Sequence, residues 1–309
     1  MRRGEANAGA RKYSESSALM RQRAKNFARL VLSRNLRNWL RAPGRSTRWI
    51  VDELRHRAGF VSTVEMRPGW RLRAHPAAIH FSYSAQLLDP EQVLEFDQFL
   101  SCTRPGMTLF DIGAHFGLFS LAACHYGGKG ALAVAVDPSP VATRMISIQA
   151  RLNSVSEQIM IIEASVSLDF AEHLMVSTGV LGAGYFLPPG DHSDAELTST
   201  RAVTLDSLTE KAGRPPTHVK IDVEGEEQSV LAGASETLGG PGAPILFMEL
   251  HNRMIRERGG DPSLTLSTVR AWGYVIYLCD GREADDGMLL SLDLVRVMCL
   301  KTAVSVVAA

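Results

Sequence analysis

Five apolar segments of the chain end in a carboxylate residue, a pattern that could gather several acids around one ligand. These residues are Asp111, Asp137, Glu163, Asp222 and Glu249. If the apolar segments are parallel strands, their carboxyl ends meet at one edge of a sheet, where open α/β sheets bind their ligands. Carboxylates in such a crevice can accept hydrogen bonds from sugar hydroxyls or take part in proton transfer.

The stretch from Thr108 to Asp137 predicts a strand, a glycine turn, a helix and a second strand in succession. Gly113 and Gly117 lie in the turn, where the missing Cβ lets the backbone approach a ligand closely. Asp137 lies twenty residues after Gly117, at the end of the second strand, and can accept hydrogen bonds from both hydroxyls of a ribose. This unit therefore predicts a nucleoside site, with a purely structural βαβ unit as the alternative.

The glycine spacing indicates which nucleoside is expected. Gly113 and Gly117 give G-x-x-x-G, whereas the dinucleotide motif G-x-G-x-x-G supplies the tighter turn that a pyrophosphate needs. The spacing therefore argues against NAD or FAD, although a dinucleotide enzyme stays as the less favoured interpretation. It favours S-adenosylmethionine, which carries adenine and ribose but no phosphate.

A second group of acids lies in VKIDVEGEE, from Val219 to Glu227. Asp222 ends a predicted strand and Glu224 stands in the turn before a helix, so both are expected to face the crevice. Glu226 and Glu227 begin that helix, where acidic residues stabilise the helix dipole. We therefore predict a role in the site for Asp222 and Glu224, and a structural role for Glu226 and Glu227.

The segment FMELH places Glu249 and His251 two residues apart, on the same side of an extended backbone. Methyl transfer from a sulfonium is an in-line displacement, so the enzyme mainly aligns donor and acceptor. If the acceptor is an alcohol, His251 is a suitable base for its proton. Alternatively, Asp222 and Glu249 could hold a divalent metal ion that acidifies the hydroxyl. The spacing does not distinguish these two mechanisms.

Strand and helix patterns alternate from Thr108 onward, which predicts a parallel sheet covered by helices on both faces. The last two strands have no full helix between them, so an antiparallel hairpin at the sheet edge is expected. Besides the βαβ unit, the predicted strands are 60–66, 70–75, 158–163, 201–205, 217–222, 244–250, 274–278 and 294–300, and the predicted helices are 17–40, 46–57, 90–100, 140–152, 226–238 and 262–272, with an irregular stretch at about 168–200.

The zero net charge of the 309 residues hides an uneven distribution. Residues 1–57 hold 15 Lys and Arg against 4 Asp and Glu, a net charge of 15 − 4 = +11. Such an arm could meet an anionic partner, or it could pack as a solvated helical cap on its own acidic body, which we prefer. The predicted organisation is a basic, partly helical N-terminal extension over 1–59, a hairpin and helix over 60–104, and a donor-binding domain over 105–309.

Four scattered cysteines form no C-x-x-C pair, which fits a reducing, cytoplasmic compartment. No run of 18 apolar residues predicts a membrane span. The arginine-rich, acid-poor N-terminus is also compatible with a transit peptide, which we consider the weaker interpretation.

Several motifs between about Asp89 and Leu250 together resemble one known family. The segments PGMTLFDIGAHFGLFSL, VAVDPSP, VTLDSL, VKIDVEGEEQSVLAGA and FMELH occur in the order and at the spacing of the FkbM family of S-adenosylmethionine-dependent methyltransferases. The resemblance implies an α/β fold of class I methyltransferase type, a Rossmann-like sheet of seven mostly parallel strands with the last one antiparallel. It also implies O-methylation of a hydroxyl on a sugar, glycan or secondary metabolite.

The same resemblance implies roles for individual residues. Asp111, Gly113 and Gly117 would form the turn around the methionine part of the donor, Asp137 would hold its ribose, Glu163, Ala164 and Ser165 would border its adenine, and Asp222 would lie near the transferred methyl group. Two residues depart from the family pattern. His115 stands where Asn is common, and could contact the donor carboxylate or replace an amide hydrogen bond. Asp137 stands where Glu is common.

Two other functions stay open at this point. The chain could be a donor-binding accessory protein without catalysis, or a nucleic-acid methyltransferase guided by its basic arm. The body of the sequence lacks a stripe of aromatic and basic residues on which bases could stack, which disfavours nucleic acid as a partner. A small-molecule or glycan acceptor is therefore the preferred expectation.

Overall fold

The computed structural model describes residues 43–168, 175–178, 184–186, 197–199 and 201–301. The chain divides into two compact units, Met1–Val51 and Asp52–Ala309. The predicted helix over 17–40 and residues 1–42 of the basic arm lie outside the described residues. Helix α3 (Pro43–Arg57) begins three residues before the predicted start at Ser46. Proline suits the first turn of a helix because it has no amide hydrogen to leave unpaired there.

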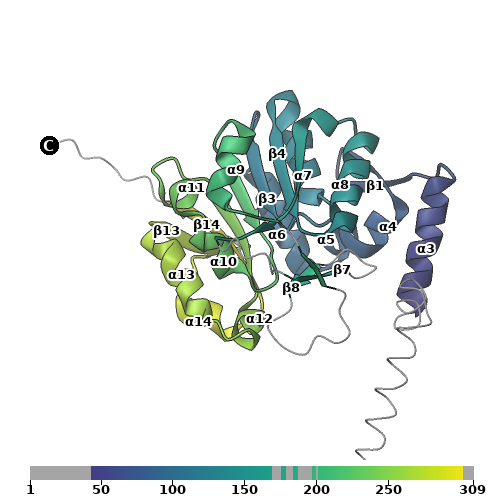
Figure 1. Ribbon diagram of the computed structural model, residues 1–309. Coiled ribbons are helices and arrows are strands. Elements are labelled where there is room, and N and C mark those ends of the chain that lie inside the picture. Colours follow the sequence, from purple (N-terminus) through teal and green to yellow (C-terminus); the bar gives the residue numbers. More distant parts are fainter. Residues whose placement is uncertain (1–42, 169–174, 179–183, 187–196, 200, 302–309) are drawn as a thin grey trace, which may run out of the picture. The chain divides into compact units, whose positions relative to one another are not determined.

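The second unit contains a seven-stranded sheet, which confirms the predicted α/β architecture (Figure 1). Its strand order is β13-β14-β12-β11-β3-β4-β5, and the strands are parallel except β14. Their bounds are β3 (Thr108–Ile112), β4 (Leu132–Asp137), β5 (Ile159–Glu163), β11 (His218–Ile221), β12 (Ile245–Leu250), β13 (Tyr274–Leu278) and β14 (Val295–Lys301). The sequence order reverses between β3 and β11, which creates a crevice beyond the carboxyl ends of these two strands.

Helices cover the sheet on both faces, which is why the central strands read as continuous apolar runs. All five residues of β3 and all four of β11 are buried. Helices α7 and α8 pack on β3, β4 and β5, and α13 packs on β13. The helices are α6 (Pro90–Ser101), α7 (Leu118–Gly127), α8 (Pro140–Leu152), α9 (Leu205–Ala212), α10 (Glu227–Ala232), α11 (Ser235–Gly239), α12 (Asn252–Glu257), α13 (Pro262–Ala271) and α14 (Asp286–Ser291).

The last two strands pair antiparallel at the edge of the sheet, which confirms the predicted hairpin. Strand β14 lies between β12 and β13 and pairs with both, so only β13 forms the edge. The short helix α14 separates the two strands along the chain.

The predicted single helix over 226–238 is wrong, because the chain forms two helices, α10 and α11. The carboxylate of Asp206 accepts hydrogen bonds from the amides of Glu236 and Thr237 and so caps a new helix start. Gly233 lies at the break, where an added Cβ would come within 3.1 Å of the Thr204 side chain. Close packing against the 204–206 segment therefore interrupts the helical pattern.

The predicted strand over 201–205 is also largely wrong. Only Ala202–Val203 (β10) is extended, and it pairs with β6 (Ser165–Val166) outside the main sheet. Thr204 then caps α9 by accepting a hydrogen bond from the amide of Ser207. The stretch expected to be irregular contains three short strands, β7 (Met175–Thr178), β8 (Gly184–Phe186) and β9 (Leu197–Ser199), in one antiparallel sheet.

The predicted hairpin is confirmed by β1 (Ser62–Arg67) and β2 (Trp70–Ala74), which pair antiparallel. Three short helical segments that were not predicted follow it: α4 (Pro76–Ala78), the π-helix η1 (Ile79–Tyr83) and α5 (Ala85–Leu88). At the end of η1, the buried Tyr83 hydroxyl donates to the Phe116 carbonyl at 2.7 Å. This bond ties the segment to the glycine turn. Within the described residues, no helix combines the length and hydropathy required to cross a bilayer.

Candidate active site

A pocket lies beyond the carboxyl ends of β3, β4 and β11, at the point where the strand order reverses. It collects residues from three of the motifs singled out in the sequence and from the segment that follows β5. Its lining includes Gly113, His115, Asp137, Ala164, Ser165, Asp222 and Glu224. These seven predicted site residues are therefore brought together around one hollow.

The glycine turn after β3 packs closely against the end of the neighbouring strand β11. Gly113 has a φ of 77°, and a Cβ added there would lie 1.8 Å from the Asp222 carbonyl oxygen. Gly117 has a φ of 76° and precedes α7 directly. Only glycine adopts this backbone conformation without strain. His115, at φ 48°, stacks its ring on Phe116 with a centroid distance of 4.0 Å.

Asp137 anchors the turn from the end of β4. Its Oδ2 accepts a hydrogen bond from the amide of His115 at 2.9 Å, and its Oδ1 accepts one from the amide of Ser139 at 2.8 Å. Burial raises the pKa of this carboxyl to about 7, although the two hydrogen bonds favour the charged form and by themselves would lower the pKa. Each carboxylate oxygen has two lone pairs, so each keeps one for a further donor in the pocket.

Asp111 takes a different position from the one predicted for the donor turn. Among the described residues that line the pocket, Asp111 is absent. Its Oδ2 instead accepts hydrogen bonds from the amide and the hydroxyl of Ser120, at 3.1 and 2.6 Å. The buried carboxylate thus joins the end of β3 to the first turn of α7. Glu163 likewise turns to α8, where Thr143 donates to it at 3.0 Å.

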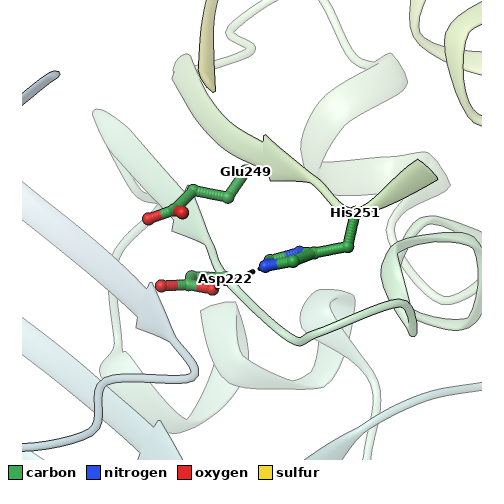
Figure 2. A group of neighbouring side chains, drawn as sticks. All are labelled: Asp222, Glu249 and His251. Atoms are coloured by element: carbon green, nitrogen blue, oxygen red, sulfur yellow. Dashed lines mark ion pairs between the residues drawn. The ribbon is translucent and has the colours of Figure 1, made fainter. Parts of the chain in front are cut away.

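Asp222, Glu249 and His251 form a cluster beside the pocket (Figure 2). They stand at the ends of β11 and β12, which are adjacent and parallel in the sheet. One polar atom from each residue lies within 4.8 Å of the others. Figure 2 shows the His251 ring pointing toward Asp222, with an Nε2–Oδ1 distance of 3.8 Å. That distance is too long for a direct hydrogen bond, so Nε2 keeps its capacity for one.

The other ring nitrogen of His251 has a partner that the sequence interpretation did not select. Nδ1 lies 2.8 Å from Oε1 of Glu227, whose side chain is fully buried. Glu227 stands in the first turn of α10, as predicted, and its carboxylate in addition contacts His251. Burial alone would lower the pKa of His251, but the Glu227 hydrogen bond and the nearby Asp222 raise it.

Glu249 belongs to a buried ionic network rather than to the open pocket. Its Oε1 lies 3.0 Å from Nζ of Lys220, and its Oε2 lies 2.9 Å from the Arg296 guanidinium. Lys220 also contacts Glu95 at 2.7 Å, and Arg296 contacts the same Glu95 at 3.3 Å. Burial alone would raise the pKa of Glu249, but the two cations hold it at about 2.

The network bears directly on whether the cluster suits a divalent metal ion. Two carboxylates, Glu95 and Glu249, already balance two cations, Lys220 and Arg296. An ion bound to Glu249 at the usual 2.0–2.6 Å would sit close to an ammonium and a guanidinium. The donor set therefore fits a divalent ion poorly, despite the short distances between its atoms.

Besides Asp137, the acids that line the pocket are Asp222, Glu224 and Glu226. Glu226 is paired with Arg258 at 3.0 Å. Burial and the neighbouring Glu249 raise the pKa of Asp222 well above its ordinary value. The Asp222 side chain is 36% exposed, so water solvates its charged form and makes this rise in pKa smaller. Glu224 adopts φ 50°, and burial raises its pKa as well.

The sequence interpretation missed Glu227 and the cations behind Glu249. Lys220 carried a visible signal, because it is a lysine inside the otherwise apolar strand HVKI. A buried lysine requires an acidic partner. Glu227 carried no such signal, since its role depends on a contact between residues 24 positions apart.

Comparisons with known proteins agree with this architecture. The strand order, with one reversed strand beside the edge, is that of class I methyltransferases. The model of the Methyltransferase FkbM domain matches residues 111–276, more than half of the chain. The chain belongs to the FkbM methyltransferase family.

Three solved structures with similar folds and low sequence identity illustrate the likeness. Methyltransferase FkbM from Methylobacillus flagellatus KT is 16% identical with a TM-score of 0.41, and the match covers 72% of this chain and 52% of that one. An O-methyltransferase from Bacillus cereus, in complex with SAH, is 12% identical with a TM-score of 0.37 over 73% and 86% of the two chains. Fibrillarin from Aeropyrum pernix, with bound S-adenosyl-L-methionine, is 12% identical with a TM-score of 0.37 over 64% and 67%.

This chain thus spans about half the length of the Methylobacillus protein. A search of curated protein sequences returned no match.

Proposed function

We propose that this protein is an S-adenosylmethionine-dependent O-methyltransferase that acts on a hydroxyl of a sugar, glycan or secondary metabolite. The observation that carries the proposal is the position of His251. Its Nε2 points toward Asp222, which lines the pocket at the reversal point of the sheet. A base is thus available next to the acids that line this pocket, in a chain of a methyltransferase family.

The donor would occupy the pocket with its ribose against Asp137 and its adenine against Ala164 and Ser165. Asp137 supports this placement because each of its oxygens keeps one free lone pair for a ribose hydroxyl. The turn from Gly113 to Gly117 would surround the methionine part, with His115 exposed to the same hollow. Asp111 and Glu163 would act indirectly, by fixing the elements that carry this turn and the adenine side.

In the proposed reaction, the acceptor oxygen attacks the methyl carbon of the sulfonium in line with the carbon–sulfur bond. The oxygen–carbon bond forms while the carbon–sulfur bond breaks, and the bonding electrons neutralise the sulfur. The hydroxyl proton passes to Nε2 of His251. Asp222 and Glu224 would hold the positively charged donor by electrostatic attraction, and the buried Glu249 would support Asp222 from behind.

The poor fit for a divalent ion favours the His251 route over metal activation of the hydroxyl. The acceptor would be a small molecule or glycan. We also propose a cytoplasmic location, since all four cysteines are free thiols.

Calorimetry with S-adenosylmethionine tests the donor site. We expect binding by the full chain and a loss of at least tenfold in affinity for Asp137→Ala, because a charge-assisted hydrogen bond contributes about 1.5–3 kcal/mol. Asp280→Ala, in a surface turn, is the matched control and should bind like the unmodified chain. Binding of NAD with no heat from S-adenosylmethionine would overturn the donor assignment.

Transfer is tested with methyl-labelled donor and pooled glycans, sugars and hydroxylated metabolites, read by mass spectrometry as an increment of about 14 daltons per methyl group. His251→Gln should slow transfer about 100-fold, the usual contribution of a general base, with unchanged donor affinity. His125→Gln, on the exposed side of α7, is the control. Donor binding without transfer to any hydroxylated acceptor would favour the accessory-protein hypothesis instead.

A further inference from the structure

Glu227 and His251 form a hydrogen-bonded carboxylate–imidazole pair just after the end of β12. Glu227 belongs to α10, whereas His251 follows β12 directly and is the N-cap residue of α12; they meet at 2.8 Å between Oε1 and Nδ1. Glu227 is fully buried, while the His251 side chain keeps 13% exposure. The carboxylate therefore lies behind the ring, and the other ring nitrogen faces the pocket side.

The same carboxylate oxygen is held by a second contact. Oε1 of Glu227 accepts a hydrogen bond from the amide of Gly225 at 3.1 Å. Gly225 has a φ of 97°, and a Cβ there would lie 2.9 Å from the Met254 side chain. The turn before α10 is thus shaped so that Glu227 turns inward, whereas a helix-dipole role would need no such anchoring.

The charge of Glu227 has a single ionic partner. In the part of the chain that the structure describes, no lysine or arginine forms an ion pair with Glu227, and His251 is its only partner of this kind. Its Oε2 is buried without a hydrogen bond. A buried carboxylate in this state is costly unless a positive charge lies beside it. Proton uptake by His251 supplies that charge.

The hydrogen bond also selects the tautomer of the neutral ring. Because Nδ1 must carry the hydrogen that Glu227 accepts, Nε2 is left unprotonated with its lone pair toward the pocket. Catalytic histidines are oriented by a buried carboxylate in this way in several unrelated hydrolases. Without an acceptor at Nδ1, the neutral ring could carry its hydrogen on either nitrogen, and Nε2 would not be fixed as the basic atom toward the pocket.

We propose that Glu227 is a positioning residue that fixes His251 with Nε2 as the proton acceptor and stabilises the imidazolium formed during transfer. This inference rests on the proposed function, since it assigns a partner to the proposed base. Glu227 itself touches neither donor nor acceptor. It acts only through the ring of His251.

Other charged groups also face His251 and enter the expected titration. Asp222 faces Nε2 from β11, and Glu249 adjoins it on β12. Glu224 lies in the turn before α10 and interacts with the same ring. The cations Lys220 and Arg296 compensate Glu249, so Asp222, Glu224 and Glu227 remain as the acids that favour the protonated ring.

Nitrogen-15 NMR of the histidine-labelled full chain tests the proposal without an acceptor. The His251 signals are assigned by their loss in His251→Gln. We expect the neutral ring to be the Nδ1–H tautomer and its titration to move to lower pH in Glu227→Gln, because the charge that raises the pKa is gone. Gln keeps an acceptor oxygen and nearly the same volume, so Nδ1–H and the fold are expected to persist.

Glu257→Gln, an exposed acid on α12 just beyond His251, is the matched control and should leave the titration unchanged. Glu227→Asp keeps the charge and should keep the titration nearer that of the unmodified chain, which separates charge from packing. A neutral Nε2–H tautomer, or an unchanged titration in folded Glu227→Gln, would overturn the inference. If transfer activity is present in either case, the proposed function survives while the role of Glu227 fails.

Once an acceptor is in hand, the pH profile of kcat/KM gives a second readout. The base must be neutral, so activity rises as pH passes the His251 titration. In Glu227→Gln the acid limb should therefore shift to lower pH while the plateau falls, because the ring is a weaker and less well oriented base. A lower plateau with an unmoved acid limb would indicate a merely structural role and refute the proposal.

Discussion

Removal of the Lys220 ammonium should destabilise the protein strongly and in a pH-dependent way. Lys220→Met keeps most of the side-chain volume but leaves Glu95 and Glu249 buried. Their side chains are 2% and 9% exposed, and Arg296 would be the one cation of the network still in contact with both. Breaking a buried pair by removing one partner costs about 3–5 kcal/mol. We expect that loss in the free energy of unfolding at pH 7.

The pH dependence follows from the pKa values of the two carboxyls. The folded pKa of Glu249 is about 2, below its ordinary value, so its stabilisation is present above the unfolded pKa and disappears as the pH falls toward 2. The folded pKa of Glu95 is raised by burial to about 7, so its burial as an anion opposes folding at neutral and higher pH. The pKa shifts of Glu249 and Glu95 therefore act on stability in opposite directions.

In Lys220→Met this balance is lost, because the ammonium that favours both anions is gone. Both carboxyls then gain by taking up protons in the folded state. The difference in unfolding free energy from the unmodified chain should therefore shrink between pH 7 and pH 4.

Urea unfolding followed by circular dichroism at pH 7 and at pH 4 measures both effects. Lys211→Met, at the exposed end of α9, is the matched control and should change stability by no more than about 0.5 kcal/mol. A loss below about 1 kcal/mol in Lys220→Met at pH 7, or a loss equal at both pH values, would refute the reasoning about the network.

Further predictions concern the turn and the metal question. Gly113→Ala should lower both the melting temperature and the affinity for the donor, because the added Cβ would lie 1.8 Å from the Asp222 carbonyl oxygen and φ 77° is strained for alanine. Scanning calorimetry and donor titration measure the two effects. Gly242→Ala, where an added Cβ meets no atom within 4 Å, is the control and should change neither quantity. Treatment with EDTA should leave methyl transfer unchanged within about twofold, because Lys220 and Arg296 already neutralise Glu249; loss of transfer that added Mg²⁺ restores would contradict the charge argument.

Much of the fold could be predicted because its signals are local. The central strands β3, β4, β11 and β12 are buried on both faces and read as apolar runs, and the turn between β3 and α7 needs glycine at positive φ. The errors arose where distant contacts override local pattern. The helix expected over 226–238 is interrupted because Asp206, far back in the chain, caps its second half.

The candidate site shows the same division. Carboxylates at strand ends could be located from sequence, since a strand end in a parallel sheet fixes the edge at which its residue lies. Which carboxylates face the pocket could not be predicted. Asp111 and Glu249 stand at strand ends like Asp137 and Asp222, yet Ser120 engages the first and Lys220 the second.

The register between β11 and β12 explains how one cluster can hold both neutralised acids and a base. Lys220 lies opposite Phe247 in this parallel pair, which brings Asp222 level with Glu249 and leaves His251 one step further out. Cations therefore occupy the deep side of the cluster and fix the charge of Glu249. On the outer side, Asp222 and His251 face each other (Figure 2), 3.8 Å apart between Oδ1 and Nε2. Glu227 contacts the other nitrogen of the ring. Lys220 and Arg296 thus hold Glu249 as an anion, whereas Asp222 and His251 are the members of the cluster that adjoin the pocket.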